Sequence, residues 1–306
     1  MALGVLGGLA WPRLAALLQP LLVPTLLIPL TLALLRLDWR ALPAWRSRPL
    51  LLGVLVAGLL VVTPVAMWLA TAPLAAMGLP DAVRTALVLM AASSPIVSSV
   101  ALALILRADA TLAAVGVLVA TALVPLTLPV LAAALLGVTL SIDLSTFMVR
   151  LVGLVGAAFA AALVLRRLAG PARLARAADA LDGLTVVNLV VFAIAIMDGV
   201  NAFARERPAF VAIAVAAAFG ANLALQAIAF ALARHLPRPQ RLAIALMAGN
   251  RNMGLVLVAL QGQAAFEVTV FFALAQIPMY VLPAILRRLY APRAAADPAQ
   301  TPDGRG

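Results

Sequence analysis

Ala248-Gly249-Asn250-Arg251-Asn252-Met253-Gly254 is a polar run inside a long apolar stretch, with the guanidinium of Arg251 at its centre. A permanently charged side chain near the middle of a bilayer costs free energy, so it usually faces a water-filled cavity or a binding site. The run therefore indicates a membrane protein with a polar site at mid-depth, and transport is the first function to consider.

The composition of the chain is that of a membrane protein with many spans. Hydrophobic residues make up 65% of its 306 residues, and the mean hydropathy is +1.14, above the range of soluble domains. The net charge of +11 would suggest nucleic acid in a soluble protein, but here the arginines lie between apolar segments. Cysteine is absent, which excludes disulfide bridges and thiolate metal sites. We expect a lipid bilayer as its surroundings, no nucleic-acid partner and no cofactor.

Apolar runs of about twenty residues recur along the chain, each long enough to cross a hydrocarbon core as a helix. They predict nine spans, at about 18–36, 49–71, 82–106, 110–136, 144–168, 180–199, 208–234, 238–261 and 264–288. The stretch 2–18 is apolar but short, and Pro12 and Arg13 interrupt it. It is either a tenth, abbreviated span or an interfacial helix.

The arginines test this map, because cytoplasmic loops carry an excess of basic residues. All 22 basic residues are arginine, and 15 of them fall on one side of the predicted spans. The opposite side holds four: Arg84, Arg150, Arg205 and Arg207. The split predicts a cytoplasmic carboxyl terminus. We expect a single transmembrane unit at 1–290, followed by a disordered tail at 291–306 that is rich in Ala, Pro and Asp.

Two predicted spans carry a polar interruption near the middle. In span 82–106 it is Ser93-Ser94-Pro95-Ile96-Val97-Ser98-Ser99, where Pro95 lacks an amide hydrogen; in span 238–261 it is Gly249-Asn250-Arg251-Asn252. If 2–18 counts as a span, these are the fourth and ninth of ten, so the matching segments cross the membrane in opposite directions. The pattern predicts inverted repeats at about 1–139 and 140–290, with a binding site where the two broken helices meet.

Several short motifs, in their order and spacing, resemble those of the bile acid:sodium symporter family, including its bacterial members of unassigned substrate. They are Arg48-Pro49-Leu50-Leu51-Leu52-Gly53, Gly78-Leu79-Pro80, Ser94-Pro95 with Ser98-Ser99 and Arg107-Ala108-Asp109, Val124-Pro125-Leu126-Thr127-Leu128-Pro129, and Gly249-Asn250-Arg251-Asn252-Met253-Gly254-Leu255. The resemblance implies an all-α membrane protein of nine or ten transmembrane helices in two inverted five-helix repeats, with panel and core domains and two discontinuous crossing helices. It also implies a secondary transporter of a small organic anion in the bacterial cytoplasmic (inner) membrane, working by alternating access.

The chain departs from this family where sodium would bind. Members that use sodium have a glutamate two residues before the glycine of the second crossing motif and a glutamine two residues after it, whereas this chain has Met247 and Arg251. The family also has a glutamine in an earlier core helix, and the matching stretch here, 58–64, contains none. After the first crossing proline the family has Gly-Gly-Thr, whereas this chain has Ile96-Val97-Ser98 after Pro95. We therefore expect no sodium coupling. Our hypothesis is that Arg251 replaces the sodium charge, holding the carbonyls of the broken helices, with attraction of an anionic substrate as a second role.

Two explanations of Arg251 stay open at this point, a functional charge and a structural pin that only satisfies carbonyls. Snorkelling to the membrane surface is less favoured, because Arg251 lies ten residues from the nearer end of its predicted span. That is about 15 Å at roughly 1.5 Å per residue.

The candidate residues for substrate or ion binding surround the two breaks. They are Ser94, Pro95, Ser98, Ser99, Thr121, Gly249, Asn250, Arg251 and Asn252. The two asparagines are the best of these, since serines also serve close helix packing. Other polar residues within spans, Asn188, Asn222, Gln226 and Gln276, are predicted at helix interfaces. The carboxylates Asp182, Asp198 and Glu267 are predicted to be solvated near span ends.

Two other function classes need to be weighed. An intramembrane enzyme is not expected, because the chain has one histidine and no pair of carboxylates within its spans. A non-transporting membrane receptor stays open, although a receptor does not need two matched broken helices. Among transporters, an auxin-efflux-type carrier is the nearest alternative, since its ten-helix plan with crossing breaks is similar.

Overall fold

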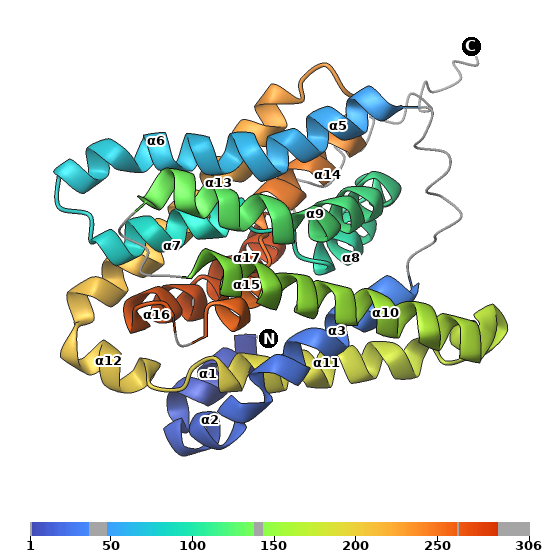
Figure 1. Ribbon diagram of the computed structural model, residues 1–306, viewed down its shortest axis with the longest axis horizontal. Helices are drawn as coiled ribbons and strands as arrows, with labels where there is room; N and C mark the ends of the chain where they lie inside the picture. The colour runs from blue at the N-terminus through green and yellow to red at the C-terminus, as the bar shows by residue number, and fades with distance from the viewer. Residues whose placement is uncertain (1, 37–47, 138–142, 262, 287–306) are drawn as a thin grey trace, which may run out of the picture.

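The computed structural model describes residues 2–36, 48–137, 143–261 and 263–286, and every regular element in these ranges is a helix (Figure 1). Seven helical runs within them are long and apolar enough to cross a membrane: Pro12–Leu35, Pro49–Ala76, Ala110–Leu136, Leu144–Arg176, Ala178–Glu206, Pro208–Leu232 and Phe266–Ile285. The chain is an integral membrane protein.

The helices form two layers that pack against each other, one towards the top and one towards the bottom of Figure 1, with the segment 266–274 between them in this view. We call the lower layer the panel; it consists of α1 (Ala2–Ala10), α2 (Pro12–Leu18), α3 (Leu22–Arg36), α10 (Leu144–Arg176) and α11 (Ala178–Ala195). We call the upper layer the core; it consists of α5 (Pro49–Ala57), the π-turn Gly58–Val62, α6 (Thr63–Ala76), α7 (Asp81–Ala92), α8 (Ser98–Ile105), α9 (Ala110–Leu136), α13 (Pro208–Leu232), α14 (Arg238–Gly249), α15 (Met253–Ala259), α16 (Phe266–Leu274) and α17 (Gln276–Ile285). The short helix α12 (Val200–Glu206) connects α11 to α13, and a 3-10 turn, Gln19–Leu21, connects α2 to α3.

Burial separates helices that face lipid from those that carry the interior. In α9 56% of its most apolar window is buried, against 22% in α10. The core also contains the half-helices α7, α14 and α15, whose residues next to the breaks are buried almost without exception. Polar backbone at membrane depth is tolerated only where protein or a cavity surrounds it. The broken segments lie inside the core, where other protein groups surround their backbone.

The amino-terminal stretch 2–18 does not form one helix. It consists of α1 and α2, nine and seven residues long, and α2 continues through the 3-10 turn towards α3. The helix α1 packs tightly on α11, because a Cβ at Gly4 would lie 2.8 Å from the Cβ of Ala193 and one at Gly8 would lie 2.7 Å from the carbonyl oxygen of Ile194. Residues 2–18 thus form two short helices that pack on the other panel helices, and α1 alone is too short to cross a bilayer.

The remaining predicted spans agree with the helices to within a few residues at most ends. The largest difference is in α10, which extends to Arg176 rather than 168, with Gly170 (φ 72°) and Pro171 interrupting its helical geometry. The spans predicted at 82–106 and 238–261 each consist of two short helices. The number of membrane crossings and the inverted-repeat relation stay predictions, and the tail at 291–306 lies outside the described residues.

Candidate functional site

The two broken helices meet at their breaks. The backbone N–H of Ile96 donates to the carbonyl of Asn250 at 2.9 Å, and the N–H of Asn252 donates to the carbonyl of Ser94 at 2.8 Å. These two bonds form a short antiparallel bridge between Pro95 and Arg251. The bridge satisfies backbone groups that would otherwise be unpaired far from water. Each unpaired group costs several kcal/mol on transfer to an apolar solvent, and about 1–3 kcal/mol when measured by mutation in proteins. Both breaks therefore lie where the sequence predicts them, and they are joined to each other.

Arg251 fills the space at this crossing and has no exposed surface. Its Nε donates to the carbonyl of Ala248 at 2.8 Å. One terminal nitrogen, Nη1, donates to the carbonyls of Leu59 at 3.0 Å and Ser93 at 2.9 Å. The other, Nη2, donates to the hydroxyl of Thr63 at 2.8 Å. The guanidinium thus joins α14, the break after α7 and the π-turn, and snorkelling is ruled out by its complete burial.

The π-turn explains why the carbonyl of Leu59 can accept hydrogen bonds from side chains. In this register each N–H donates to the carbonyl five residues earlier, as the N–H of Thr63 does to Gly58. The next donor in the series would be residue 64, which is Pro64 and has no N–H. The carbonyl of Leu59 is consequently left for side chains, and it accepts from Thr63 Oγ1 at 2.6 Å as well as from Arg251.

The charge of Arg251 faces the negative ends of two half-helices. Ala248 lies in the last turn of α14, and Ser93 caps the carboxyl end of α7. Each helix end of this kind carries about −0.5 of an elementary charge. Among the described residues the partners of Arg251 are carbonyls and one hydroxyl, so no carboxylate there neutralises it. The two helix ends are the negative partner of the guanidinium.

Asparagines complete the caps around the break. Asn222 on α13 donates to the carbonyl of Gly249 at 2.9 Å, and Gln226 in turn donates to the side-chain oxygen of Asn222. Asn250 donates from its amide to the carbonyl of Leu246 at 3.0 Å. A Cβ at Gly249 would overlap Gln226, which is why the last residue of α14 has no side chain. Asn222 and Gln226 are interface residues, as the sequence predicts.

Met247 stands two residues before Gly249, where the resemblance to sodium-using members of the family implies a glutamate. It packs on α9, since a Cβ at Gly116 would lie 2.7 Å from Met247 Sδ. Met247 is fully buried among apolar neighbours and offers no hard oxygen ligand. At this motif Met247 therefore offers no oxygen ligand, and Arg251 supplies a fixed positive charge.

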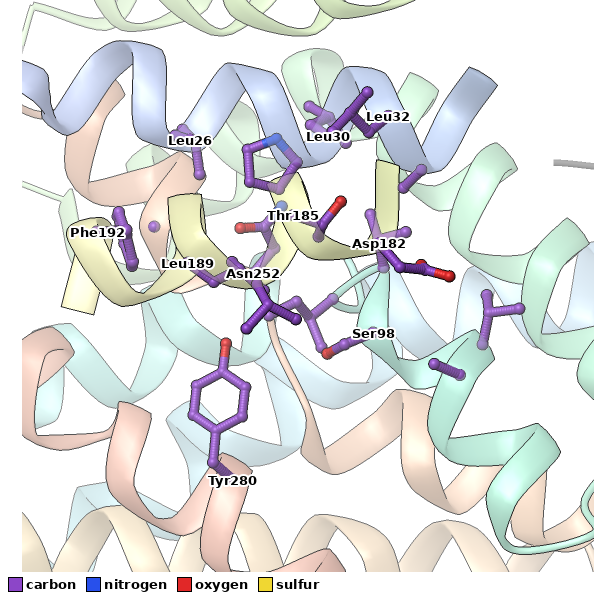
Figure 2. Close-up of a pocket in the computed structure, with 18 of the residues that line it drawn as sticks. Leu26, Leu30, Leu32, Ser98, Asp182, Thr185, Leu189, Phe192, Asn252 and Tyr280 are labelled. Atoms are coloured by element: carbon purple, nitrogen blue, oxygen red, sulfur yellow. The ribbon is translucent and has the colours of Figure 1, made fainter. Parts of the chain in front are cut away.

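A cavity of about 760 Å³ lies between panel and core, beside the crossing (Figure 2). Its described lining is mostly apolar, from α3, α8, α9, α11, α15 and α17. Its polar lining residues are Thr25, Ser98, Thr111, Asp182, Thr185, Asn252, Gln276 and Tyr280. Figure 2 shows Phe192, Leu189, Thr185 and Asp182 in succession along α11, and Tyr280 directing its hydroxyl into the cavity from α17. The end at Leu104, Ile105 and Asp182 adjoins the loops on the arginine-rich side of the predicted spans.

The structure divides the predicted site residues into three groups. Ser98 and Asn252 line the cavity. Pro95, Gly249, Asn250 and Arg251 form the crossing and do not line it. Ser94, Ser99 and Thr121 are buried, and their hydroxyls have no hydrogen-bond partner in the structure.

Several cavity residues were not predicted as site residues. Asp182 is exposed near a span end, as the sequence predicts, and it also lines the cavity. Gln276, which the sequence places at a helix interface, lines the cavity as well. Thr25, Thr185 and Tyr280 also line it, and Thr63 binds Arg251. For Thr63 a signal existed, because Thr63-Pro64 inside a span marks a disturbed helix. For the others the sequence alone gives no signal, because they line the cavity only through the helix face that packing turns inward.

Comparison with models of protein families gives a match. The family model described as "Sodium Bile acid symporter family" matches residues 23–204, from α3 to α12, which is more than half of the chain. The matched region includes the first broken helix and most of the cavity lining, and it ends before α14 and Arg251. A search of curated proteins found no match.

Proposed function

Because the chain belongs to the sodium bile acid symporter family, a family of membrane transporters, we propose that it moves a small organic anion across the bacterial cytoplasmic membrane by alternating access. The carboxyl terminus lies in the cytoplasm in this proposal. The match also favours this family over the auxin-efflux-type carrier considered from the sequence.

The observation that carries the proposal is the bonding of Arg251 to the carbonyls of Ala248 and Ser93 at the ends of two half-helices. A monovalent cation is attracted to such a place, because two helix ends of about −0.5 each face one another there. Arg251 supplies that cation permanently, since a guanidinium has one positive charge and several donors for carbonyl oxygens. Transport in this protein then needs no sodium ion at the crossing.

We assign the binding of the substrate's negative charge to the amino end of a half-helix, which is its positive end. With the carboxyl ends of α7 and α14 occupied by Arg251, the positive amino end of α8 is left facing the cavity, where Ser98 lies. The apolar lining suits the organic body of the substrate. Direct contact between Arg251 and the substrate is not part of the proposal, because the guanidinium does not reach the cavity surface.

Uptake of a panel of organic anions into proteoliposomes tests this function. We expect at least one anion to accumulate, at equal rates in sodium chloride and choline chloride. Loss of uptake in choline would overturn the role given to Arg251 and leave the transport function intact. If no anion crosses the membrane while one of them still raises the melting temperature of the protein, the receptor alternative replaces transport.

A further inference from the structure

A second, smaller hollow of about 240 Å³ lies on the same seam between panel and core. Its lining is Gln19, Leu22, Ala195, Ile196, Asp198, Leu257, Val258, Leu260, Gln261, Ala264, Phe266, Val268, Thr269 and Phe272. Three helices that line the main cavity, namely α3, α11 and α15, also line this hollow at residues further from the arginine-rich side. The two hollows therefore lie one beyond the other along the same three helices.

On each of these helices the two hollows are about one turn apart. Along α3 the last residue of the main cavity is Thr25 and the second hollow begins at Leu22. Along α11 the corresponding residues are Phe192 and Ala195, and along α15 they are Gly254 and Leu257. A single turn of helix is about 5.4 Å long. The wall between the hollows is therefore about one layer of side chains thick.

The wall is closed by an unusually close approach of the two layers. A Cβ at Gly254 would lie 2.9 Å from Cζ of Phe192 and 3.0 Å from Cδ1 of Leu26. A phenyl ring and a leucine side chain from the panel thus press directly on the backbone of α15 in the core. Figure 2 shows Leu26 and Phe192 together at the end of the cavity away from Asp182.

The second hollow has the lining of a wet vestibule. Gln19, Asp198, Gln261 and Thr269 contribute polar side chains to it, whereas empty cavities that stay dry are lined by apolar groups. Two of its polar residues lie in connections between helices, where water reaches them: Asp198 precedes α12 and Gln261 follows α15. Solvent from the side opposite the arginine-rich loops can therefore enter it.

We propose that Leu26, Phe192 and Gly254 are the gate of the transport path, and that the smaller hollow is the vestibule on its far side. This inference rests on the proposed transport function. Because the gate lies between panel and core, a small displacement of one layer against the other separates the three residues without breaking any helix. Gly254 is the gate residue of the core, and any side chain there would hold the two layers apart.

Cysteine labelling tests the gate, and the natural absence of cysteine gives the test a clean background. The variant Leu257→Cys places a thiol in the vestibule, and Leu104→Cys places one at the mouth of the main cavity. A membrane-impermeant maleimide is added to inside-out and right-side-out vesicles. We expect Leu104→Cys to react from one face, which defines the near side, and Leu257→Cys to react from the other.

Phe192→Ala is then added to Leu257→Cys. Removing the ring connects the hollows, so we expect the rate of near-side labelling to increase about tenfold. This is the change given by a shift of about 1.4 kcal/mol in the free-energy difference between the closed and the open gate. Leu26→Ala is expected to act in the same direction. Phe147→Ala is the control, because it removes an equally buried phenyl that lines neither hollow.

Two results would overturn the gate. One is near-side labelling of Leu257→Cys that is already fast without a second change, and the other is a near-side rate that Phe192→Ala and Leu26→Ala raise no more than Phe147→Ala does. Labelling needs neither substrate nor ion. A gate that behaves as expected in a protein that moves no organic anion would therefore count against the proposed function alone.

Discussion

Replacing Arg251 by methionine is expected to destabilise the protein strongly. Methionine keeps an unbranched side chain but has no donor, so the carbonyls of Leu59, Ser93 and Ala248 lose their charged partner while they stay buried. A buried acceptor left without its partner costs roughly 1–3 kcal/mol. The carbonyls of Ser93 and Ala248 lose their partner, whereas that of Leu59 keeps Thr63 Oγ1, so the loss is about 3 kcal/mol. Methionine also avoids the cost of burying a charge. That gain does not remove the carbonyls, whose oxygens belong to the backbone and still face one another.

Thermal unfolding of the purified protein in detergent measures this cost. A loss of about 3 kcal/mol corresponds to a fall of about 5 °C in melting temperature for a chain of 306 residues, because its unfolding entropy is about 0.64 kcal/mol/K. Arg251→Lys keeps the charge but not the planar fork that reaches three elements, so its fall is expected to be intermediate. The control is Arg205→Met, at an exposed arginine in the last turn of α12. If Arg251→Met melts at the same temperature as Arg205→Met, the crossing does not depend on the guanidinium and the reasoning is refuted.

Two further predictions concern other parts of the fold. Gly249→Ala places a methyl group against Gln226 at the end of α14, so its melting temperature is expected to fall by several degrees, whereas Gly53→Ala, where nothing lies within 4 Å, serves as the control and is expected to stay within about 1 °C. Hydrogen bonds, first of all from Thr146, lower the pKa of Asp143 to about 2. The stabilisation from its carboxylate is therefore present above the ordinary pKa near 4 and is lost as the pH falls through about 2. Acid unfolding followed by tryptophan fluorescence is expected to show a smaller loss between pH 4 and pH 2 in Asp143→Asn, and equal curves would contradict the assignment.

The positions of the breaks could be predicted from the sequence because their causes are local. Pro95 has no amide hydrogen, and Gly249 with Asn250 weakens a helix wherever it stands. The contact between the breaks is not local, since it joins residues more than 150 positions apart. It was expected only because the breaks occupy matching places in the chain and because the motifs resemble a family with crossing helices.

The residues of the cavity were harder to predict. Asp182 lies near the start of α11 and Gln276 at the start of α17, positions where a polar side chain ordinarily faces water or a neighbouring helix. Which face of each helix turns towards the cavity depends on the packing of panel against core, and hydrophobic periodicity is weak in helices that are apolar all round. The sequence therefore located the crossing but only Ser98 and Asn252 of the cavity lining.

Whether residues 2–18 form a span could not be settled from composition either. Residues 2–18 are apolar enough for a span, yet Trp11 and Pro12 separate two short helices. Their arrangement depends on Gly4 and Gly8, which let α1 lie directly on α11. Close packing through glycine is a property of the pair of helices, and one helix read alone shows only half of it.

The most direct test of the central claim is the effect of sodium on melting temperature, measured against choline at equal ionic strength for the natural protein and for Arg251→Gln. A bound ion stabilises the folded state by about 1.4 kcal/mol when its concentration is ten times its Kd. With Arg251 in place of the ion, we expect no sodium effect on the natural protein. We expect a gain for Arg251→Gln, whose shorter amide frees space beside the carbonyls of Leu59, Ser93 and Ala248. A gain in the natural protein as large as in the variant would contradict the account.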